Sequence, residues 1–287
     1  KTINDYLNKL LDVERDRVIA IDTDSVYVSM SDLIRKVNPD NPVEFLDTVG
    51  EKKLQPLFDK AYTELNDRMC GYENRMNMSR EAIADKGVWA AKKRYILNVH
   101  NNEGVQYSEP KLKIMGLEAV KSSTPQVVRD KFKKAFIIIL TQTEADLQKF
   151  VSDFYNEFIS LPAEDVSFPR GVSDMTKWKD KKTRWKKGCP IHVRGAIMYN
   201  LLLKEHGLSS EEIKNGSKVK FCYLKLPNPS KENVISFPQF LPKEFDLNDY
   251  VDKDTQFEKT FKEPLSFIAD AVDWKLSKST TLEDFFS

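Results

Sequence analysis

The sequence predicts an α+β fold, and three features of its patterning indicate this class. Short β-branched runs lie on either side of a polar tip at 22–25, which is the pattern of a hairpin. A second stretch, 88–115, shows the period of two that is typical of strands, and amphipathic segments with helical spacing surround it. The 287 residues, 40% hydrophobic, are enough for two domains with substantial cores.

The first hairpin is expected over 18–30, with the sequence VIAIDTDSVYVSM. A helix over 1–11 precedes it, and an amphipathic helical region over 43–69 follows it. The tip carries Asp22 and Asp24, two carboxylates that repel each other unless a cation lies between them. Magnesium takes one or two protein carboxylates and leaves its other positions to water and substrate phosphates. The tip therefore fits a Mg²⁺ site, and it equally fits an Asx-turn with solvated acids.

The second hairpin is expected to have strands over 88–100 and 105–115, joined by a turn at 101–104. Its first strand carries three cations beside an aromatic ring: Lys92, Lys93, Arg94 and Tyr95. Such a strand is able to present charge to a phosphate backbone or a duplex groove. The alternative is a solvated edge strand whose lysines discourage aggregation.

The rest of the chain is expected to be mainly helical, with one strand. Helices are predicted from a hydroxyl cap and proline at 122–125 to 140, from a capping box at Thr143 and Asp146 to 161, over 191–207 and over 254–274. A strand is predicted over 218–226, followed by an irregular proline-rich connection to 242.

A basic segment separates these helices. Between 170 and 194, seven cations surround Trp178 and Trp185: Lys177, Lys179, Lys181, Lys182, Arg184, Lys186 and Lys187. So many charges are too costly to bury, so we expect a polyanion partner rather than only a solvated loop. The formal net charge is +1, so this affinity must arise from local clustering.

Composition excludes several other classes. Cys70, Cys189 and Cys222 are widely spaced and form no CxxC pair, which argues against a disulfide framework or a zinc ribbon. No apolar run approaches the ~20 residues that cross a bilayer, and the N-terminus lacks a signal-peptide pattern. We therefore expect a soluble cytoplasmic protein without a membrane partner.

The last residues, 275–287, form a polar tail that ends in an apolar triplet. A single helical turn would bring Leu282, Phe285 and Phe286 to one side. Such a triplet at a chain end is typical of an anchor for a groove on another protein, and the alternative is that it packs on its own domain.

Longer motifs resemble the C-terminal part of family B DNA polymerases of the T-even bacteriophage type. In chain order they are IDTDSVYV, SREAIADKGVWAAKKRYILNV, EPKLKIMGLEAVKSSTP, CPIHVRG, FEKTFKEPL and LEDFF. The resemblance implies a DNA-directed DNA polymerase, a nucleotidyltransferase that acts on primer-template DNA and deoxynucleoside triphosphates. It also implies two Mg²⁺ ions in the assembled site, and action in the host cytoplasm.

The resemblance assigns roles to individual residues. Asp24 matches the metal-binding catalytic aspartate and Asp22 its companion, while the LEDFF tail is similar to sliding-clamp anchor peptides. The matching motifs, together with the basic segment, give the expected DNA-binding residues: Lys92, Lys93, Arg94, Tyr95, Lys121, Lys182, Arg184, Lys186, Lys187, His192 and Arg194. Two positions depart from the family pattern, Ile21 in place of the usual glycine and Ser79 in place of an acid.

The family comparison also implies a domain organisation. We expect a partial palm with an antiparallel sheet over 1–121, a mainly α-helical thumb with a small β element over 122–274, and a clamp-binding tail over 275–287. The exonuclease, the fingers and a second palm strand with its aspartate have no counterpart here. We therefore expect one half of a split polymerase, inactive until a separate N-terminal polymerase chain completes it.

Two other functions are compatible with the residues alone. One is a non-catalytic subunit that binds DNA and tethers the clamp. The other is a metal-dependent glycosyltransferase, in which Asp22-Thr23-Asp24 would be the DxD motif that holds a sugar nucleotide. The glycosyltransferase would need neither the clustered cations nor the clamp-like tail.

Overall fold

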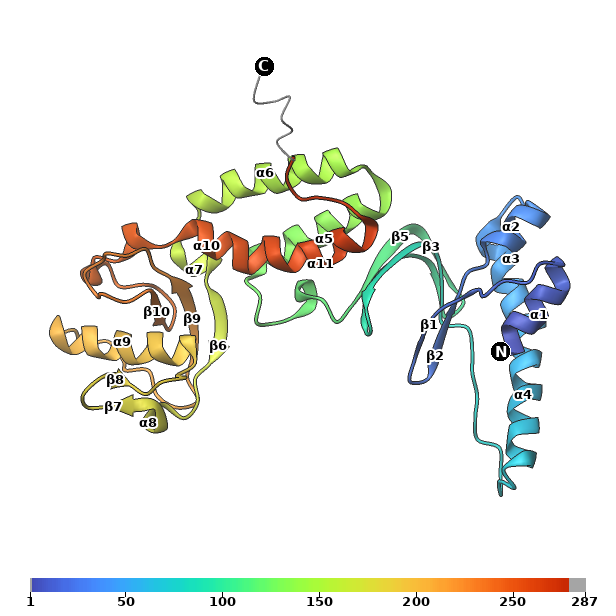
Figure 1. Cartoon of the computed structure of the whole chain (residues 1–287), viewed down its shortest axis with the longest axis horizontal. Coiled ribbons are helices and arrows are strands. Elements are labelled where there is room, and N and C mark those ends of the chain that lie inside the picture. Colours follow the sequence, from blue (N-terminus) through green and yellow to red (C-terminus); the bar gives the residue numbers. More distant parts are fainter. Residues whose placement is uncertain (1, 279–287) are drawn as a thin grey trace, which may run out of the picture. The chain divides into compact units, whose positions relative to one another are not determined.

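The computed structural model describes residues 2–278, which form two compact units. The first unit contains the chain up to Gly87 together with 97–113, and the second contains 88–96 and the chain from Ile114 onwards. Helices and small antiparallel sheets occur in both (Figure 1). The predicted α+β class is confirmed. The domain boundary expected at residue 121 stays a prediction, and residues 88–96, which lie before it, belong to the second unit.

The first unit consists of a helical layer and the expected hairpin. Its elements are α1 (Thr2–Leu11), β1 (Val18–Asp22), β2 (Ser25–Val28), α2 (Ser31–Val37), α3 (Pro42–Val49), the π-helical η1 (Gly50–Leu54) and α4 (Gln55–Arg68). The base of the hairpin is fixed by Arg17, whose buried side chain pairs with Asp32 of α2 at 3.3 Å. The Arg17 backbone N–H also donates to Asn4 of α1 at 3.0 Å. The prediction missed α2.

Three strands follow the helices: β3 (Ala82–Ala91), β4 (Arg94–Asn102) and β5 (Val105–Met115), in the order β3-β4-β5. The prediction of one continuous strand over 88–100 was wrong, because a turn at Lys92 and Lys93 divides it. Lys93 has a left-handed φ of 62°, and both lysines are exposed. Two adjacent ammonium groups are easier to solvate at a turn than within a packed strand.

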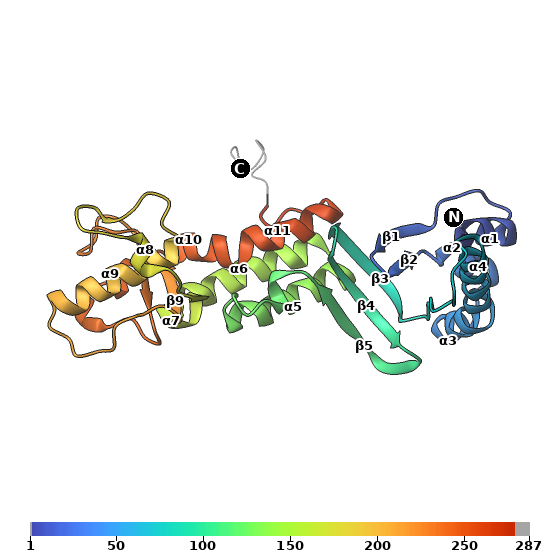
Figure 2. The same ribbon diagram turned by 90° about the horizontal axis from the view of Figure 1, so that it is seen from below.

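A helical layer forms one part of the second unit. It contains η2 (Glu118–Val120), α5 (Gln126–Thr141), α6 (Glu144–Ser160), α7 (Ala163–Val166) and the run α10 (Lys253–Phe257), η5 (Glu258–Lys262), α11 (Glu263–Ala269) and η6 (Asp270–Val272). Helices α5, α6 and α11 lie side by side (Figures 1 and 2). The Phe261 ring lies 4.9 Å from Phe132 and 4.8 Å from Phe154, so aromatic packing holds the layer together.

The predicted helix starts had different outcomes. The capping box at Thr143 and Asp146 is confirmed, since each side chain bonds the backbone of the other. The hydroxyl cap expected for α5 was wrong: Pro125 is the N-cap, and no side chain bonds the first turn. Proline has a fixed φ and no N–H, so it begins this helix by its backbone shape.

A small sheet with one covering helix forms the other part of the second unit. Its elements are β6 (Phe168–Gly171), α8 (Met175–Trp178), β7 (Lys179–Asp180), β8 (Arg184–Trp185), α9 (Ile191–Glu205), β9 (Lys218–Tyr223), β10 (Val234–Phe237), η3 (Lys243–Phe245) and η4 (Asn248–Tyr250). The antiparallel order is β10-β9-β6. Strand β10 lies in the segment predicted to be irregular, and the basic segment contains short elements.

Candidate active site and nucleic-acid interface

The acidic hairpin turns at Thr23 and Asp24, and Asp22 pairs with Ser25 across it. Thr23 has a φ of 50°, and its hydroxyl donates to the Asp22 carboxylate at 3.2 Å. The Ser25 hydroxyl donates to the Asp22 carbonyl oxygen at 3.1 Å. The Asp24 side chain is exposed and forms no salt bridge with another residue of 2–278. The local fold thus holds Asp24 at the tip, where its carboxylate is available to a cation.

The hairpin offers the right kind of donor for magnesium, but only part of a site. Carboxylate oxygens are the hard ligands that Mg²⁺ prefers. Among the residues that the structure describes, no group of three or more His, Cys, Asp or Glu side chains is placed to hold a metal ion. Asp22 and Asp24 therefore fit Mg²⁺ only if further ligands come from water, from substrate or from elsewhere.

The hairpin also exposes apolar surface. Ile19 is 50% exposed and Ile21 is 70% exposed. These residues alternate with half-buried positions along β1, and Ile19 lies where the register with β2 shifts. Large apolar side chains gathered on a strand are typical of a surface that another element covers.

The lysines at the turn between β3 and β4 differ from the tyrosine that follows them. Lys92 and Lys93 are exposed, whereas Tyr95 is only 3% exposed. The Tyr95 ring lies 6.0 Å from the ring of Trp89. Gly116 approaches this turn closely, because a Cβ atom there would lie 2.1 Å from the carbonyl oxygen of Lys93. The lysine side chains thus lie at the surface of the turn, and the tyrosine supports the turn from within.

Arg94 belongs to a network of side chains centred on Glu118. Arg94 donates to both carboxylate oxygens of Glu118, at 2.9 and 3.0 Å, and its guanidinium lies 4.5 Å above the Phe267 ring. Lys121 donates to the same carboxylate at 2.9 Å. These contacts favour a structural role for Arg94, which joins the strand to the helical layer. They also hold Lys121 at a defined place.

Five lysines of the basic segment extend into solvent. Lys179, Lys181, Lys182, Lys186 and Lys187 are exposed and form no salt bridge within the part of the chain that the structure describes. The turn between β7 and β8 is held by the Asp180 carboxylate, which accepts hydrogen bonds from the backbone N–H groups of Lys182 and Thr183, both at 2.8 Å.

The other basic residues of this region have protein partners. Arg184 pairs with Glu232 at 3.5 Å, and Lys177 lies 5.1 Å from the Trp178 ring centre. Arg194 donates to the Asn233 side chain at 2.5 Å. The five lysines are therefore the part of the segment whose charge is least compensated by the protein.

His192 lies in the first turn of α9 and lines a cavity of about 440 Å³. Burial lowers the pKa of His192, and the neighbouring Arg170 lowers it further, while a bond to the Gly171 carbonyl acts in the opposite direction. Lys121 also lines this cavity, so two of the predicted DNA-binding residues meet there.

Two basic residues that sequence reasoning missed also line this cavity, namely Arg170 and Lys259. Arg170 comes from β6 and Lys259 from η5, so 89 positions of chain separate them. Lys259 lies within the motif FEKTFKEPL, which was a usable signal. For Arg170, only its place at the edge of the basic segment hinted at a role.

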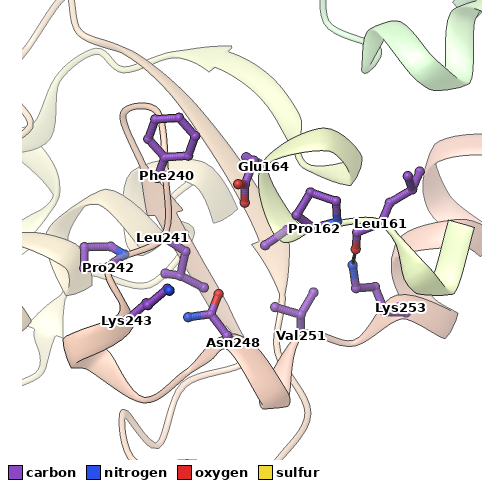
Figure 3. A pocket seen from close by; sticks show the side chains of 11 residues that line it. Leu161, Pro162, Glu164, Phe240, Leu241, Pro242, Lys243, Asn248, Val251 and Lys253 are labelled. Carbon is purple, nitrogen blue, oxygen red and sulfur yellow. Dashed lines mark hydrogen bonds between the residues drawn. The ribbon is translucent and has the colours of Figure 1, made fainter.

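A second cavity of about 530 Å³ lies near the end of α6 (Figure 3). Its walls include the apolar side chains of Leu241 and Val251, and Phe240 at its edge is 65% exposed. The Lys253 ammonium donates to the carbonyl oxygen of Leu161, as Figure 3 shows. Lys243 and Glu164 also line this cavity, so it gathers fewer basic groups than the first one.

Two expectations concern other parts of the chain. The residues expected to bind a clamp, Leu282, Phe285 and Phe286, lie outside the described residues. None of the helices in the described part is both long and apolar enough to span a bilayer.

The chain was compared with known proteins. No family model matches it. Over its whole length it is 36% identical to a DNA-directed DNA polymerase of Enterobacteria phage T4 and 33% identical to one of Escherichia phage RB69. The chain covers 34% of each, about a third of the length of these curated relatives. The predicted resemblance to a T4-like family B polymerase is confirmed for this stretch.

Proposed function

We propose that this chain, a relative of the T4-like family B DNA polymerases over about a third of their length, supplies part of a DNA-directed DNA polymerase. The observation that carries the proposal is that the whole chain aligns with two such enzymes. The exposed Asp24 carboxylate and the five unpaired lysines support it, because nucleotidyl transfer needs a metal site and a grip on the phosphate backbone.

In this proposal Asp24 and Asp22 hold Mg²⁺ together with ligands from another polypeptide. Asp22 and Asp24 would hold the metal, which when bound would supply stabilisation of the negative charge that develops during nucleotidyl transfer. The two carboxylates keep hard oxygen donors at the tip of a short hairpin. The exposed Ile19 and Ile21 support a completing partner, because another strand or helix would remove their side chains from water.

The duplex grip is proposed to come from two regions of the chain. Lys92 and Lys93 at the turn between β3 and β4 contact the primer-template near the insertion site, and the basic segment with Lys121 and His192 holds the phosphates of the duplex. Arg94 and Tyr95 act by shaping the turn, as the Glu118 pair and the burial of Tyr95 support. The tail residues Leu282, Phe285 and Phe286 anchor a sliding clamp, a proposal that rests on their sequence pattern.

Primer extension by a reconstituted pair tests the proposal. The purified chain is mixed with a second polypeptide that carries the exonuclease, the fingers and the rest of the palm. We expect synthesis in Mg²⁺ only from the pair. In D24N the rate should fall by more than the about 10- to 100-fold that is typical of losing a metal's outer-shell partner. Duplex affinity should stay unchanged, because Asp24 makes no favourable phosphate contact.

A matched control separates catalysis from a general effect of removing a carboxylate. D40N makes the same chemical change at another exposed aspartate of the first unit, and it should extend primers normally. If D24N were as active as D40N, the hairpin would have no catalytic role. Robust synthesis by the chain alone would instead contradict the need for a partner.

A non-catalytic function is the second candidate, because the described residues contain no complete metal-ligand group. In that case the chain would bind DNA and tether a clamp while another protein performed the chemistry. D24N distinguishes the two functions, since only the catalytic one loses synthesis with duplex binding retained. The glycosyltransferase alternative is less well supported, because the chain aligns with polymerases over its whole length.

A further inference from the structure

The cavity beside the first turn of α9 has features that the basic segment does not explain. It lies inside the second unit, between β6, β9, the residues before α5 and the run α10–α11. Arg170 and His192 are half-buried in its wall, whereas Lys121 and Lys259 are exposed. Basic groups from four separate parts of the chain thus line one cavity of about 440 Å³.

Arg170 is the feature that points to a ligand. Its guanidinium lies 5.4 Å from the ring centre of Phe168 and 5.9 Å from that of Phe221, and burial lowers its pKa. No carboxylate among the described residues pairs with it. A half-buried cation without a counter-ion loses hydration that neutral carbonyl groups and aromatic rings replace only in part.

Only one nitrogen of the Arg170 guanidinium donates hydrogen bonds to the described protein, so its other N–H groups can bind a ligand. Its Nη1 atom donates to the carbonyl oxygens of Ser123 and Pro169, both at 2.9 Å. The Nε and Nη2 atoms form no hydrogen bond with any residue of 2–278. Two parallel N–H groups on a fixed planar guanidinium match two oxygens of a phosphate.

The other basic side chains differ from Arg170, because carboxylates already hold two of them. Lys121 pairs with Glu118, and Lys259 pairs with Glu263. His192 stands beside Arg170. While its imidazole is neutral, it provides no negative charge to balance the guanidinium. An anion in the cavity would supply the negative charge that Arg170 lacks, and it would also favour a protonated His192.

We propose that this cavity is a seat for one backbone phosphate of the bound duplex, with Arg170 donating to it through two N–H groups and His192 beside it. The inference rests on the proposed function, since it names a fixed point within the duplex grip. This phosphate seat differs from the lysines of the basic segment, which are exposed on a turn. Phosphate contacts of this fixed kind set the register of a protein on nucleic acid.

Position-specific interference with single methylphosphonates tests the seat. A set of primer-template duplexes is made in which one backbone phosphate at a time is replaced by the uncharged analogue. The full chain should bind one of these duplexes about tenfold more weakly than its neighbours, which is the effect of one lost charged hydrogen-bonded contact. R170Q should bind every duplex at this weakened affinity, without the position-specific loss.

Two further variants control for charge and for folding. R170K keeps the charge but loses the fork, so it should also lose the position-specific effect. K204Q removes an exposed lysine at the other end of α9, which pairs with Glu212, and it should bind as the unchanged chain does. Thermal denaturation checks that each variant is folded, and R170K carries the test if R170Q is not.

A second measurement separates this inference from the proposed function. At matched ionic strength, replacing chloride with inorganic phosphate should raise the melting temperature of the unchanged chain more than that of R170K, because the general salt effect is the same in both proteins. If the chain bound no duplex but kept the phosphate-specific stabilisation, the proposed function would fail and the cavity would take a free anion instead. If no single methylphosphonate weakened binding selectively, or if R170K kept the selective loss, the phosphate seat would be wrong.

Discussion

At the scale of single residues, His192 shows how the surroundings of a side chain in a cavity wall shift its pKa. Burial and Arg170 lower its pKa below the ordinary value, so the free chain holds the imidazole neutral at neutral pH. The unfolded chain then binds more protons than the folded chain as the pH falls below about 6.5. This residue therefore lowers the free energy of unfolding progressively below that pH and has no such effect above it.

A phosphate beside His192 should reverse this shift, and duplex binding should then take up a proton. Burial and Arg170 disfavour the charged imidazole in the free chain, whereas the Gly171 carbonyl favours it. The other charged groups that line the cavity are Lys121, Lys259 and Glu118. We predict that duplex affinity rises as the pH falls from about 7.5 to about 5.5, by at most about tenfold per pH unit for one proton. Fluorescence anisotropy at constant ionic strength measures the affinity.

The matched variant for this prediction is H192N, which keeps a polar side chain but does not titrate. Its affinity should vary less with pH than that of the unchanged chain over the same range. An equal pH dependence in both proteins would assign the effect to other groups, and a flat profile in the unchanged chain would mean that no phosphate lies near His192.

At the scale of elements, α9 packs so closely on the small sheet that one of its residues must be glycine. A Cβ atom at Gly195 would lie 2.7 Å from the backbone nitrogen of Ser236 and 2.9 Å from the carbonyl carbon of Ile235, both on β10. The Ser236 hydroxyl donates to the His192 carbonyl oxygen at 2.8 Å across the same contact. The close approach thus fixes the helix turn that carries His192.

We predict that G195A lowers the free energy of unfolding by up to about 2 kcal/mol. Alanine gains up to about 1 kcal/mol of helix propensity over glycine, but overpacking against backbone costs about 1–3 kcal/mol. Urea denaturation measures the change, and K204Q on the same helix serves as the control with an effect within about 0.5 kcal/mol. A more stable G195A would show that the sheet and the helix move apart at no cost.

Elements were predictable from the sequence where local pattern decides them. The hairpin over 18–30 and the helix capped by Thr143 follow from neighbouring residues alone, and both are confirmed. The turn at Lys92 and Lys93 and the strand β10 were missed. A strand of four buried residues inside a proline-rich segment forms because β9 and α9 pack on it, and contacts of that kind leave no local periodicity.

The candidate site was likewise predictable only where residues close together in the sequence form it. The carboxylates at 22 and 24 stand two residues apart, so their proximity is visible in the sequence. Arg170, in contrast, acquires its setting from Ser123, 47 positions away, and from the ring of Phe221 on a neighbouring strand. Its exposure and its lack of a counter-ion are properties of the folded chain, and residue type alone does not reveal them.

At the scale of the whole molecule, charge is nearly balanced but unevenly compensated. The chain has 45 Lys and Arg residues against 44 Asp and Glu residues, so its net charge gives no attraction for a polyanion. Many lysines of the second unit are paired with nearby carboxylates, for example Lys131 with Glu157 and Lys262 with Glu258. Attraction for a duplex must therefore come from the basic side chains that no carboxylate compensates.

This difference predicts which lysines set the salt dependence of duplex binding. Changing four uncompensated lysines of the basic segment, Lys181, Lys182, Lys186 and Lys187, to glutamine should make the plot of log affinity against log salt concentration less steep. The slope should fall by up to about 3.6, because each neutralised phosphate contributes about 0.9 on B-form DNA. Fluorescence anisotropy over a series of chloride concentrations gives the slopes for both proteins.

The decisive comparison uses a variant with the same net charge. Changing four salt-bridged lysines of the second unit, Lys131, Lys133, Lys204 and Lys262, to glutamine removes equal charge from sites where a carboxylate already neutralises it. If the uncompensated lysines bind phosphate directly, only the first variant loses slope, because counterion release depends on contacts with phosphates. Equal losses in both variants would mean that the duplex responds to the overall field of the protein, and the basic segment would then have no special part in the grip.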